Sequence, residues 1–129
     1  MCECGATHDE RPRQGLALIA PGDRHLEVDQ GGVLRVTDGP EVNGCRPSAD
    51  VTMKSAAQVF GRRAVGLLMT GMGKDGAEGL AAIKAAGGKT LAQDKDSSVI
   101  WGMPRAAVEL GVVDEVVGLE EIAARLGKI

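Results

Sequence analysis

The sequence has very few aromatic residues: Phe60 and Trp101 are the only two, whereas glycine occurs 19 times among 129 residues. A core with so few rings has to be built from Val, Leu, Ile, Ala and Met side chains. Such a composition suits an α/β domain with tight turns and argues against an aromatic-rich β-sandwich. The length corresponds to one domain.

Long apolar runs and an excess of positive charge are also missing. No apolar stretch approaches the roughly 18 residues that a membrane-spanning helix needs. The polar start, residues 1–4, has no apolar signal-peptide core. The net charge of -3, without a basic stripe, gives no support to nucleic-acid binding. We therefore expect a cytoplasmic protein with no membrane insertion and no nucleic-acid partner.

Cysteine is scarce, and Cys2, Cys4 and Cys45 form an odd count without a disulfide framework. Cys2, Cys4 and His8 could in principle hold a metal. The two cysteines are separated by one residue rather than two to four, and no fourth ligand is evident. We expect no metal and no cofactor. Residues 1–14 are charged and aperiodic, which predicts an irregular leader before a domain that covers residues 15–129.

Apolar patterns after this leader predict an alternation of strands and helices. A buried strand is expected at residues 16–20, followed by an antiparallel hairpin of residues 25–29 and 33–36 and a loop over residues 37–47. The expected helices cover residues 48–60, 75–86, 104–110 and 119–126, and further extended segments cover residues 64–69, 89–92, 112–113 and 116–117. The fold class predicted is α/β, a partial doubly wound and mostly parallel sheet with an antiparallel hairpin.

The most informative stretch is Thr70-Gly71-Met72-Gly73-Lys74-Asp75-Gly76, which follows a predicted strand and opens a predicted helix. Its glycines allow a tight turn, and Asp75 lies near the first turn of the helix. The carboxyl end of a parallel strand is where α/β sheets place their chemistry. One interpretation gives Asp75 no role beyond capping its own helix.

A second interpretation is dinucleotide binding, because Gly71-Met72-Gly73-Lys74-Asp75-Gly76 matches the pattern G-x-G-x-x-G. Asp94, 18 residues beyond Gly76, stands near the position of a ribose-binding carboxylate. Asp75, however, places a negative charge where the pyrophosphate would meet the helix N-terminus, which disfavours binding. A P-loop is excluded because Asp75 follows Gly73-Lys74 where Ser or Thr is required.

A third interpretation comes from a family resemblance. The run from Leu67 to Ala77 resembles the aspartate motif of the chemotaxis protein-glutamate methylesterases. Four further segments are similar to the same family in the same order: residues 19–26, residues 46–51, Ala92-Gln93-Asp94 and Trp101-Gly102-Met103-Pro104. The resemblance extends from about Gly15 to the end of the chain.

The resemblance implies a carboxylic ester hydrolase that removes glutamate methyl esters from its partner, a methylated chemoreceptor. It also implies a Ser-His-Asp triad on a mostly parallel α/β sheet. Asp75 corresponds to the triad aspartate, which orients the histidine and stabilises its charged form. The backbone N–H of Met72 corresponds to the donor that stabilises the oxyanion.

The two other triad positions have no counterpart in the sequence. In the family the serine and histidine motifs precede the segment that corresponds to Ala20-Pro21-Gly22, and only residues 1–14 and a short strand precede it here. His25 belongs to the Ala20-Pro21-Gly22 segment, which favours a surface or hairpin role. None of the serines examined has a glycine-flanked elbow: Ser48, Ser55, Ser97 and Ser98.

Two hypotheses from different classes follow. The chain is either a truncated methylesterase domain that is inactive alone or a non-catalytic remnant that binds a partner. Both predict a sheet that is open at residues 16–19 or 64–69, and an unpaired edge or uncovered apolar face of this kind promotes self-association.

Overall fold

The computed structural model describes residues 2–129 and confirms the α/β fold class. Its strands form three small sheets. Strand β1 (Cys2–Gly5) pairs in parallel with β2 (Leu16–Ile19), and β3 (His25–Val28) pairs antiparallel with β4 (Leu34–Thr37). The third sheet is parallel, in the order β5 (Val65–Leu68), β6 (Lys89–Gln93), β7 (Glu115–Val117).

Residues 1–14 are not irregular throughout, which corrects the expectation from their composition. Cys2–Gly5 form β1, in register with β2 from Cys2 opposite Leu16 to Gly5 opposite Ile19. Beyond β1, the segment stays attached through backbone hydrogen bonds, such as the one from the Leu34 N–H to the Glu10 carbonyl (2.7 Å). Apolar periodicity could not reveal this strand because its stability comes from backbone pairing with β2.

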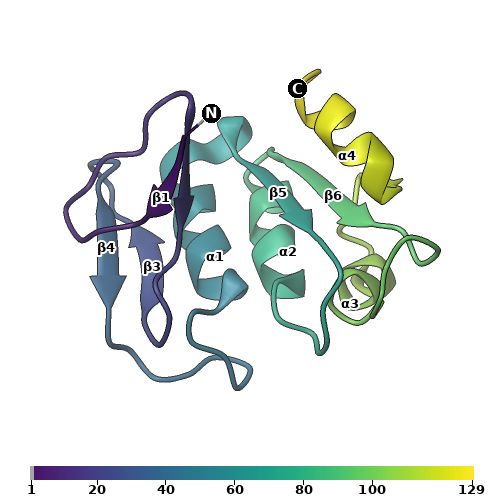
Figure 1. The fold of residues 1–129 in the computed structure, drawn as a ribbon, viewed down its shortest axis with the longest axis horizontal. Coiled ribbons are helices and arrows are strands. Elements are labelled where there is room, and N and C mark those ends of the chain that lie inside the picture. Colours follow the sequence, from purple (N-terminus) through teal and green to yellow (C-terminus); the bar gives the residue numbers. More distant parts are fainter. Residues whose placement is uncertain (1) are drawn as a thin grey trace.

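Four α-helices complete the chain. They are α1 (Ala49–Phe60), α2 (Ala77–Ala85), α3 (Met103–Leu110) and α4 (Leu119–Leu126), and the short 3₁₀-helix η1 (Gly61–Arg63) follows α1. Helix α1 lies between the β3–β4 hairpin on one side and α2 on the other (Figure 1). The two helices approach closely at Gly79, where a Cβ atom would lie 2.7 Å from the Met53 Cβ.

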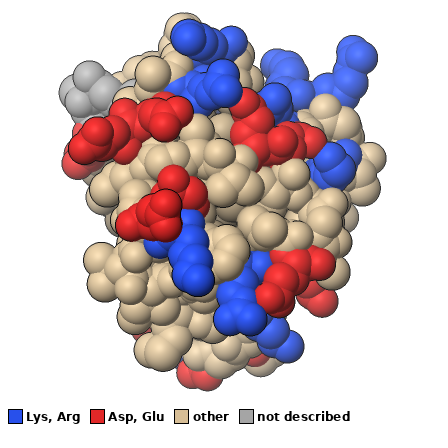
Figure 2. Space-filling model, turned by 90° about the vertical axis from the view of Figure 1, so that its right-hand side faces the viewer, with Lys and Arg blue, Asp and Glu red and all other residues tan. Residues whose placement is uncertain are grey.

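The core of the second half is aliphatic, as the composition predicts. Leu80, Ile83 and Leu91 are almost fully buried, and Ala107 of α3 packs in one cluster with Leu80. Charged side chains of both signs are interspersed on the right-hand face of the molecule (Figure 2). Ion pairs of the second half include Lys84–Asp114, Lys89–Glu115 and Arg105–Glu109.

The parallel sheet is interrupted between β2 and β5. Within residues 2–129, β2 pairs only with β1 and β5 pairs only with β6. Apolar residues of these strands and of the position just after β5 are exposed: Ile19 is 59% exposed, Val65 39% and Met69 41%. The open edges expected from the sequence are therefore present at both strands.

The described part of the chain contains neither a helix that could span a membrane nor a candidate metal site. Over residues 2–129, no helix combines the length and the apolar composition that membrane crossing requires. The described side chains also contain no group of three His, Cys, Asp or Glu residues arranged to hold a metal. The Cys2 side chain, a member of the candidate metal set, lies outside the described part. His8 of that set accepts the Val36 N–H (3.1 Å) through Nδ1.

Candidate active site at the glycine loop

The first part of the glycine loop, Thr70–Gly73, is held by backbone contacts with the segment at residues 100–103. The Gly71 N–H donates to the Ile100 carbonyl (2.9 Å), and the Gly71 carbonyl accepts the N–H groups of Gly102 (3.1 Å) and Met103 (2.9 Å). The Thr70 N–H donates to the side-chain oxygen of Gln93 (2.8 Å). The loop therefore leaves β5 in a fixed direction.

Close packing of backbone on backbone adds to this restraint. A Cβ atom at Gly102 would lie 2.7 Å from the Gly71 oxygen and 3.1 Å from the Gly73 nitrogen, so only glycine fits. Gly73 itself has φ of 93°, a left-handed conformation that glycine adopts without strain. Both glycines are therefore required for the observed conformation of the loop, Gly102 for lack of space and Gly73 for its positive φ.

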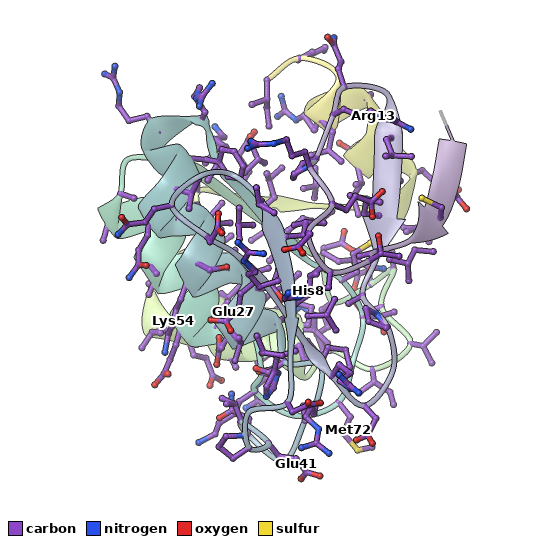
Figure 3. All side chains as sticks on the ribbon, turned by 90° about the vertical axis from the view of Figure 1, so that its left-hand side faces the viewer. His8, Arg13, Glu27, Glu41, Lys54 and Met72 are labelled. Atoms are coloured by element: carbon purple, nitrogen blue, oxygen red, sulfur yellow. The ribbon has the colours of Figure 1, made fainter. Side chains whose placement is uncertain are left out.

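Met72 stands at the tip of the loop with its side chain 79% exposed. Figure 3 shows Met72 at the same end of the molecule as Glu41, so the loop at residues 38–47 and the glycine loop share this end. No acceptor within residues 2–129 takes the Met72 N–H. An unpaired N–H on a rigid loop is a suitable donor for an oxyanion.

Asp75 is buried, at 5% exposure, and its carboxylate binds the N-terminus of α1. Its Oδ1 accepts the Ser48 hydroxyl (2.6 Å) and an N–H of the Asn43 amide (3.0 Å), and its Oδ2 accepts the Ala49 N–H (2.6 Å). The capping interpretation is therefore wrong in its choice of helix. Asp75 caps α1, while the helix that follows it, α2, begins at Ala77 after the N-cap residue Gly76, which has no side chain to cap it.

Opposing effects act on the pKa of Asp75. Burial raises the pKa, whereas the hydrogen bonds from Ser48, Asn43 and the N–H groups of Ala49 and Asp50 lower it, and together they prevail, so the pKa lies below its ordinary value. All these donors are neutral. Asp75 is thus a buried anion at neutral pH, without a cationic partner among the contacts that surround it.

Asp50, in the first turn of α1, is the counterpart of Asp75. Its exposure is 1%, and its Oδ1 accepts the N–H groups of Gly76 (3.0 Å) and Gly79 (2.7 Å) at the start of α2. Its Oδ2 accepts the Asn43 amide (2.7 Å). The sequence suggested Asp50 only as a cap for α1. Its contact with α2 joins elements that no sequence spacing connects.

This arrangement argues against dinucleotide binding. The position at the start of α2 that a pyrophosphate would occupy is filled by the Asp50 carboxylate, which binds two N–H groups there. Asp94 closes a local turn by accepting the Ser97 N–H (2.9 Å) and hydroxyl (2.5 Å). That hydroxyl contact lowers the pKa of Asp94. Neither carboxylate is arranged to bind a ribose or a phosphate.

His25 is buried at 2% exposure rather than on the surface, although it does belong to the β3–β4 hairpin. Its Nδ1 accepts the Ser48 N–H (3.2 Å). Its Nε2 lies 2.7 Å from the Pro40 carbonyl and therefore carries the proton. Both ring nitrogens are occupied by backbone groups, so His25 fixes the loop before α1 and has no nitrogen left to act as a base.

The candidate serines are engaged in structural hydrogen bonds. Ser48 donates to Asp75, Ser97 donates to Asp94, and Ser98 donates to the Asp94 carbonyl (2.6 Å). Ser55 donates to the Thr52 carbonyl (2.8 Å). None of the four hydroxyls has a histidine nitrogen as its hydrogen-bond acceptor within residues 2–129, and a serine nucleophile requires that contact.

A cavity of about 370 Å³ lies beside Asp75. Asp75 and Ser48 contribute its polar wall, and Pro47, Met53 and Met103 contribute apolar walls. Ala20, just after β2, also lines the cavity, which therefore extends from the residue after β2 to Asp75 in the loop after β5. A group that entered from this side would meet the Asp75 carboxylate in an apolar setting.

A mostly parallel sheet with a buried carboxylate beyond the end of β5 defines the chain as an α/β domain with its candidate site at the strand ends. Comparison with known proteins then gives the family. The family model described as CheB methylesterase matches residues 3–126. The chain therefore belongs to the CheB methylesterase family.

Individual relatives agree with this assignment. A protein-glutamate methylesterase/protein-glutamine glutaminase of Pyrococcus abyssi is 55% identical over 112 residues, covering 84% of this chain and 30% of the relative. A protein of the same name from Photorhabdus laumondii is 50% identical over 124 residues, with 94% and 35% covered. The chain thus spans about a third of the length of the curated relatives it matches.

A solved structure is similar as well. The catalytic domain of Thermotoga maritima CheB methylesterase superimposes with a TM-score of 0.90 at 34% identity. The match covers 95% of this chain and 66% of that chain. The remaining third of that domain has no counterpart within the matched region.

Proposed function

We propose that this chain supplies the aspartate and the oxyanion donor of an active site that hydrolyses glutamate methyl esters on chemoreceptors. The observation that carries the proposal is the Asp75 carboxylate, which is buried, ionised and bound only by neutral donors at the wall of a cavity. An aspartate that orients a catalytic histidine needs these properties, because it has to stay charged and fixed while the imidazole beside it gains a proton.

The reaction is acyl transfer in two steps. A serine oxygen attacks the ester carbonyl while a histidine takes the serine proton, and Asp75 stabilises the resulting imidazolium. The Met72 N–H stabilises the negative oxygen of the tetrahedral intermediate. The histidine then gives the proton to the methoxide as methanol leaves. Water attacks the acyl-serine in the second step and releases the glutamate carboxylate.

The serine and the histidine of this proposal come from outside the residues that align here. The match to 66% of the Thermotoga maritima domain leaves a third of that domain for them. The unpaired edges of β2 and β5 support the idea that this remaining part contributes at least one strand between them. The histidine would then enter the cavity beside Asp75. The same proposal includes a partial domain over residues 15–129, to which β1 adds residues 2–5 by pairing with β2.

The chain alone is expected to show no methylesterase activity above background. Aspartate and oxyanion donors cannot form an acyl intermediate without a nucleophile, and removal of the serine from a triad costs about a million-fold in kcat. The test is methanol release from methylated receptor by the chain alone and by a fusion that places the missing part of the Thermotoga maritima domain ahead of it. Activity of the chain alone that disappears on replacement of Ser48, Ser97 or Ser98 would refute the proposal.

The names of the relatives also include glutaminase activity on protein glutamine. An amide and an ester of the same side chain pass through the same acyl-serine, with ammonia or methanol as the leaving group. We therefore expect the fusion to act on glutamine side chains as well. Assay of ammonia release beside methanol release tests both reactions with one preparation.

A second function, partner binding without catalysis, is favoured by the exposed apolar side chains Ile19, Val65 and Met69 at the open edges. Addition of the missing part distinguishes the two functions, because a catalytic chain gains activity and a binding remnant only gains compactness. Self-association of the chain alone and a cytoplasmic location stay predictions. Light scattering across a dilution series tests the first.

A further inference from the structure

Helices α1 and α2 begin side by side and exchange their N-terminal caps. Ser48 and Gly76 hold the two N-cap positions, and neither makes a side-chain cap bond to its own helix. The Asp75 carboxylate binds the first N–H of α1, and the Asp50 carboxylate binds two N–H groups at the start of α2. The start of α1 is therefore satisfied by a carboxylate that lies just before α2, and the start of α2 by a carboxylate of α1, as helix N-termini favour.

A single amide group joins these two carboxylates. The Asn43 nitrogen donates one N–H to Asp50 Oδ2 (2.7 Å) and the other to Asp75 Oδ1 (3.0 Å). The opposite orientation of the amide would point its oxygen at two carboxylate oxygens, so the contacts determine which atom is the nitrogen. Both donors of the Asn43 side chain are thus used on the two buried anions.

The backbone presents this amide from a tight turn. Val42 and Cys45 exchange two backbone hydrogen bonds, from the Val42 N–H to the Cys45 carbonyl (3.0 Å) and back (2.9 Å). Asn43 and Gly44 between them have φ of 55° and 73°, as in the Asn-Gly turns of tight hairpins. Among side chains that tolerate positive φ, aspartate is only an acceptor when ionised, whereas asparagine offers two donors.

We propose that Asn43 is a positioning residue for Asp75, whose side-chain amide links the Asp75 carboxylate to Asp50 and holds it in the orientation that a catalytic histidine requires. This role rests on the proposed function of Asp75. The amide is the only group with hydrogen bonds to both carboxylates in the part of the chain that the structure describes. It therefore links the N-terminus of α1, the N-terminus of α2 and the loop at residues 38–47.

The physical need for this link is the proximity of two negative charges. Within residues 2–129, neither Asp50 nor Asp75 forms an ion pair with Lys, Arg or His. When two carboxylates share a site without a cation, one of them tends to take up a proton. A proton on Asp75 would remove the acceptor that a histidine N–H needs. The amide N–H donated to Asp75 opposes this by favouring the charged form of Asp75.

The first test needs no variant, because Asn43 is the only asparagine in the sequence. Selective ¹⁵N labelling of asparagine therefore gives one side-chain NH₂ group in an NMR spectrum. We expect the shift of the proton that is donated to Asp75 to change when the Asp75 carboxylate takes up a proton on acidification. If neither proton shift of the Asn43 side chain changes over the pH range in which Asp75 titrates, the proposal is wrong.

The second test is the titration of Asp75 in Asn43→Gly. Glycine keeps the positive φ of the turn and removes only the amide. We expect the Asp75 carboxyl carbon to titrate about one pH unit higher than in the unaltered chain. The matched control is Glu41→Gln, which removes an exposed charge from the same loop and should leave the Asp75 titration unchanged. An unshifted titration in Asn43→Gly, or equal shifts in both variants, would overturn the proposal.

These tests separate the inference from the proposed function. Neither measurement needs turnover, so both can succeed even when a completed domain proves inactive. In that case Asn43 still orients Asp75, and only the catalytic use of Asp75 is wrong. Conversely, an active fusion in which Asn43→Gly leaves kcat and its pH profile unchanged would overturn the positioning role and leave the proposed function intact.

Discussion

The two ends of the glycine loop are held by different kinds of contact. Thr70–Gly73 are packed against residues 100–103 by backbone hydrogen bonds and by a glycine that admits no Cβ atom. Asp75–Gly76 are held by side-chain carboxylates and an amide, with anions at both helix ends. We call Thr70–Gly73 the packed end and Asp75–Gly76 the polar end. Added side-chain volume should therefore lower the stability of the protein at the packed end, and changes of charge should lower it at the polar end.

This difference also divides the chemistry proposed for the loop. The packed end carries the Met72 N–H, where a donor of constant position is needed whatever the pH. The polar end carries Asp75, whose charge state and orientation both matter.

The largest loss of stability is expected from Asp50→Ala. The substitution leaves the Gly76 and Gly79 N–H groups and one Asn43 N–H without their buried acceptor, which costs about 3 kcal/mol in the free energy of unfolding. Urea unfolding measures the change. The control is Asp96→Ala, an exposed carboxylate, with an expected change within about 0.5 kcal/mol. Equal losses in the two variants would contradict the exchanged caps.

A smaller loss is expected from Gly102→Ala at the packed end. The new Cβ would lie 2.7 Å from the Gly71 oxygen, and backbone atoms cannot rotate away, so the loop has to shift at a cost of about 2 kcal/mol. Gly22→Ala is the matched control, because no atom lies within 4 Å of a Cβ built there. If both alanine variants unfold at the same urea concentration, close packing does not hold this end.

The smallest effect is the response of the polar end to acid. Because hydrogen bonds hold the pKa of Asp75 below its ordinary value of 3.8, the stability that its charge contributes is present above that pH and is lost as the pH falls through the lower folded value. Urea unfolding at pH 6 and pH 3 should therefore show a larger loss for the unaltered chain than for Asp75→Asn. The same loss in both would show that Asp75 is not a stabilised anion.

The two ends also differ in how far they could be predicted from the sequence. The strand, the glycines and Asp75 lie within one continuous run, so local pattern and family resemblance both identify them. The partners of Asp75 lie in residues 43–50 and meet it only through the packing of α1 on α2, which no spacing reveals. The sequence therefore predicts Asn43 only as part of a loop, and Asp50 only as a cap for its own helix.

The boundaries of helices and strands are likewise predicted well where local sequence sets them and poorly where contacts with distant residues do. Helix α2 begins at Ala77 rather than at Asp75, because Gly76 has φ of 99° and cannot continue a helix toward the loop. Of the two extended pieces expected between residues 112 and 117, only β7 pairs as a strand. Local pattern does not predict strand β1, because its stability depends on β2, which lies more than ten residues further along the chain.

The central claim is that Asp75 serves as the aspartate of a methylesterase triad. The most direct measurement is methanol release from methylated receptor by the fusion that adds the unmatched third of the Thermotoga maritima domain, with and without Asp75→Asn. We expect an active fusion whose kcat falls by about 10⁴-fold in the variant, because asparagine at this position would hold the histidine in the wrong tautomer. An active fusion with the same kcat in both forms would contradict the account.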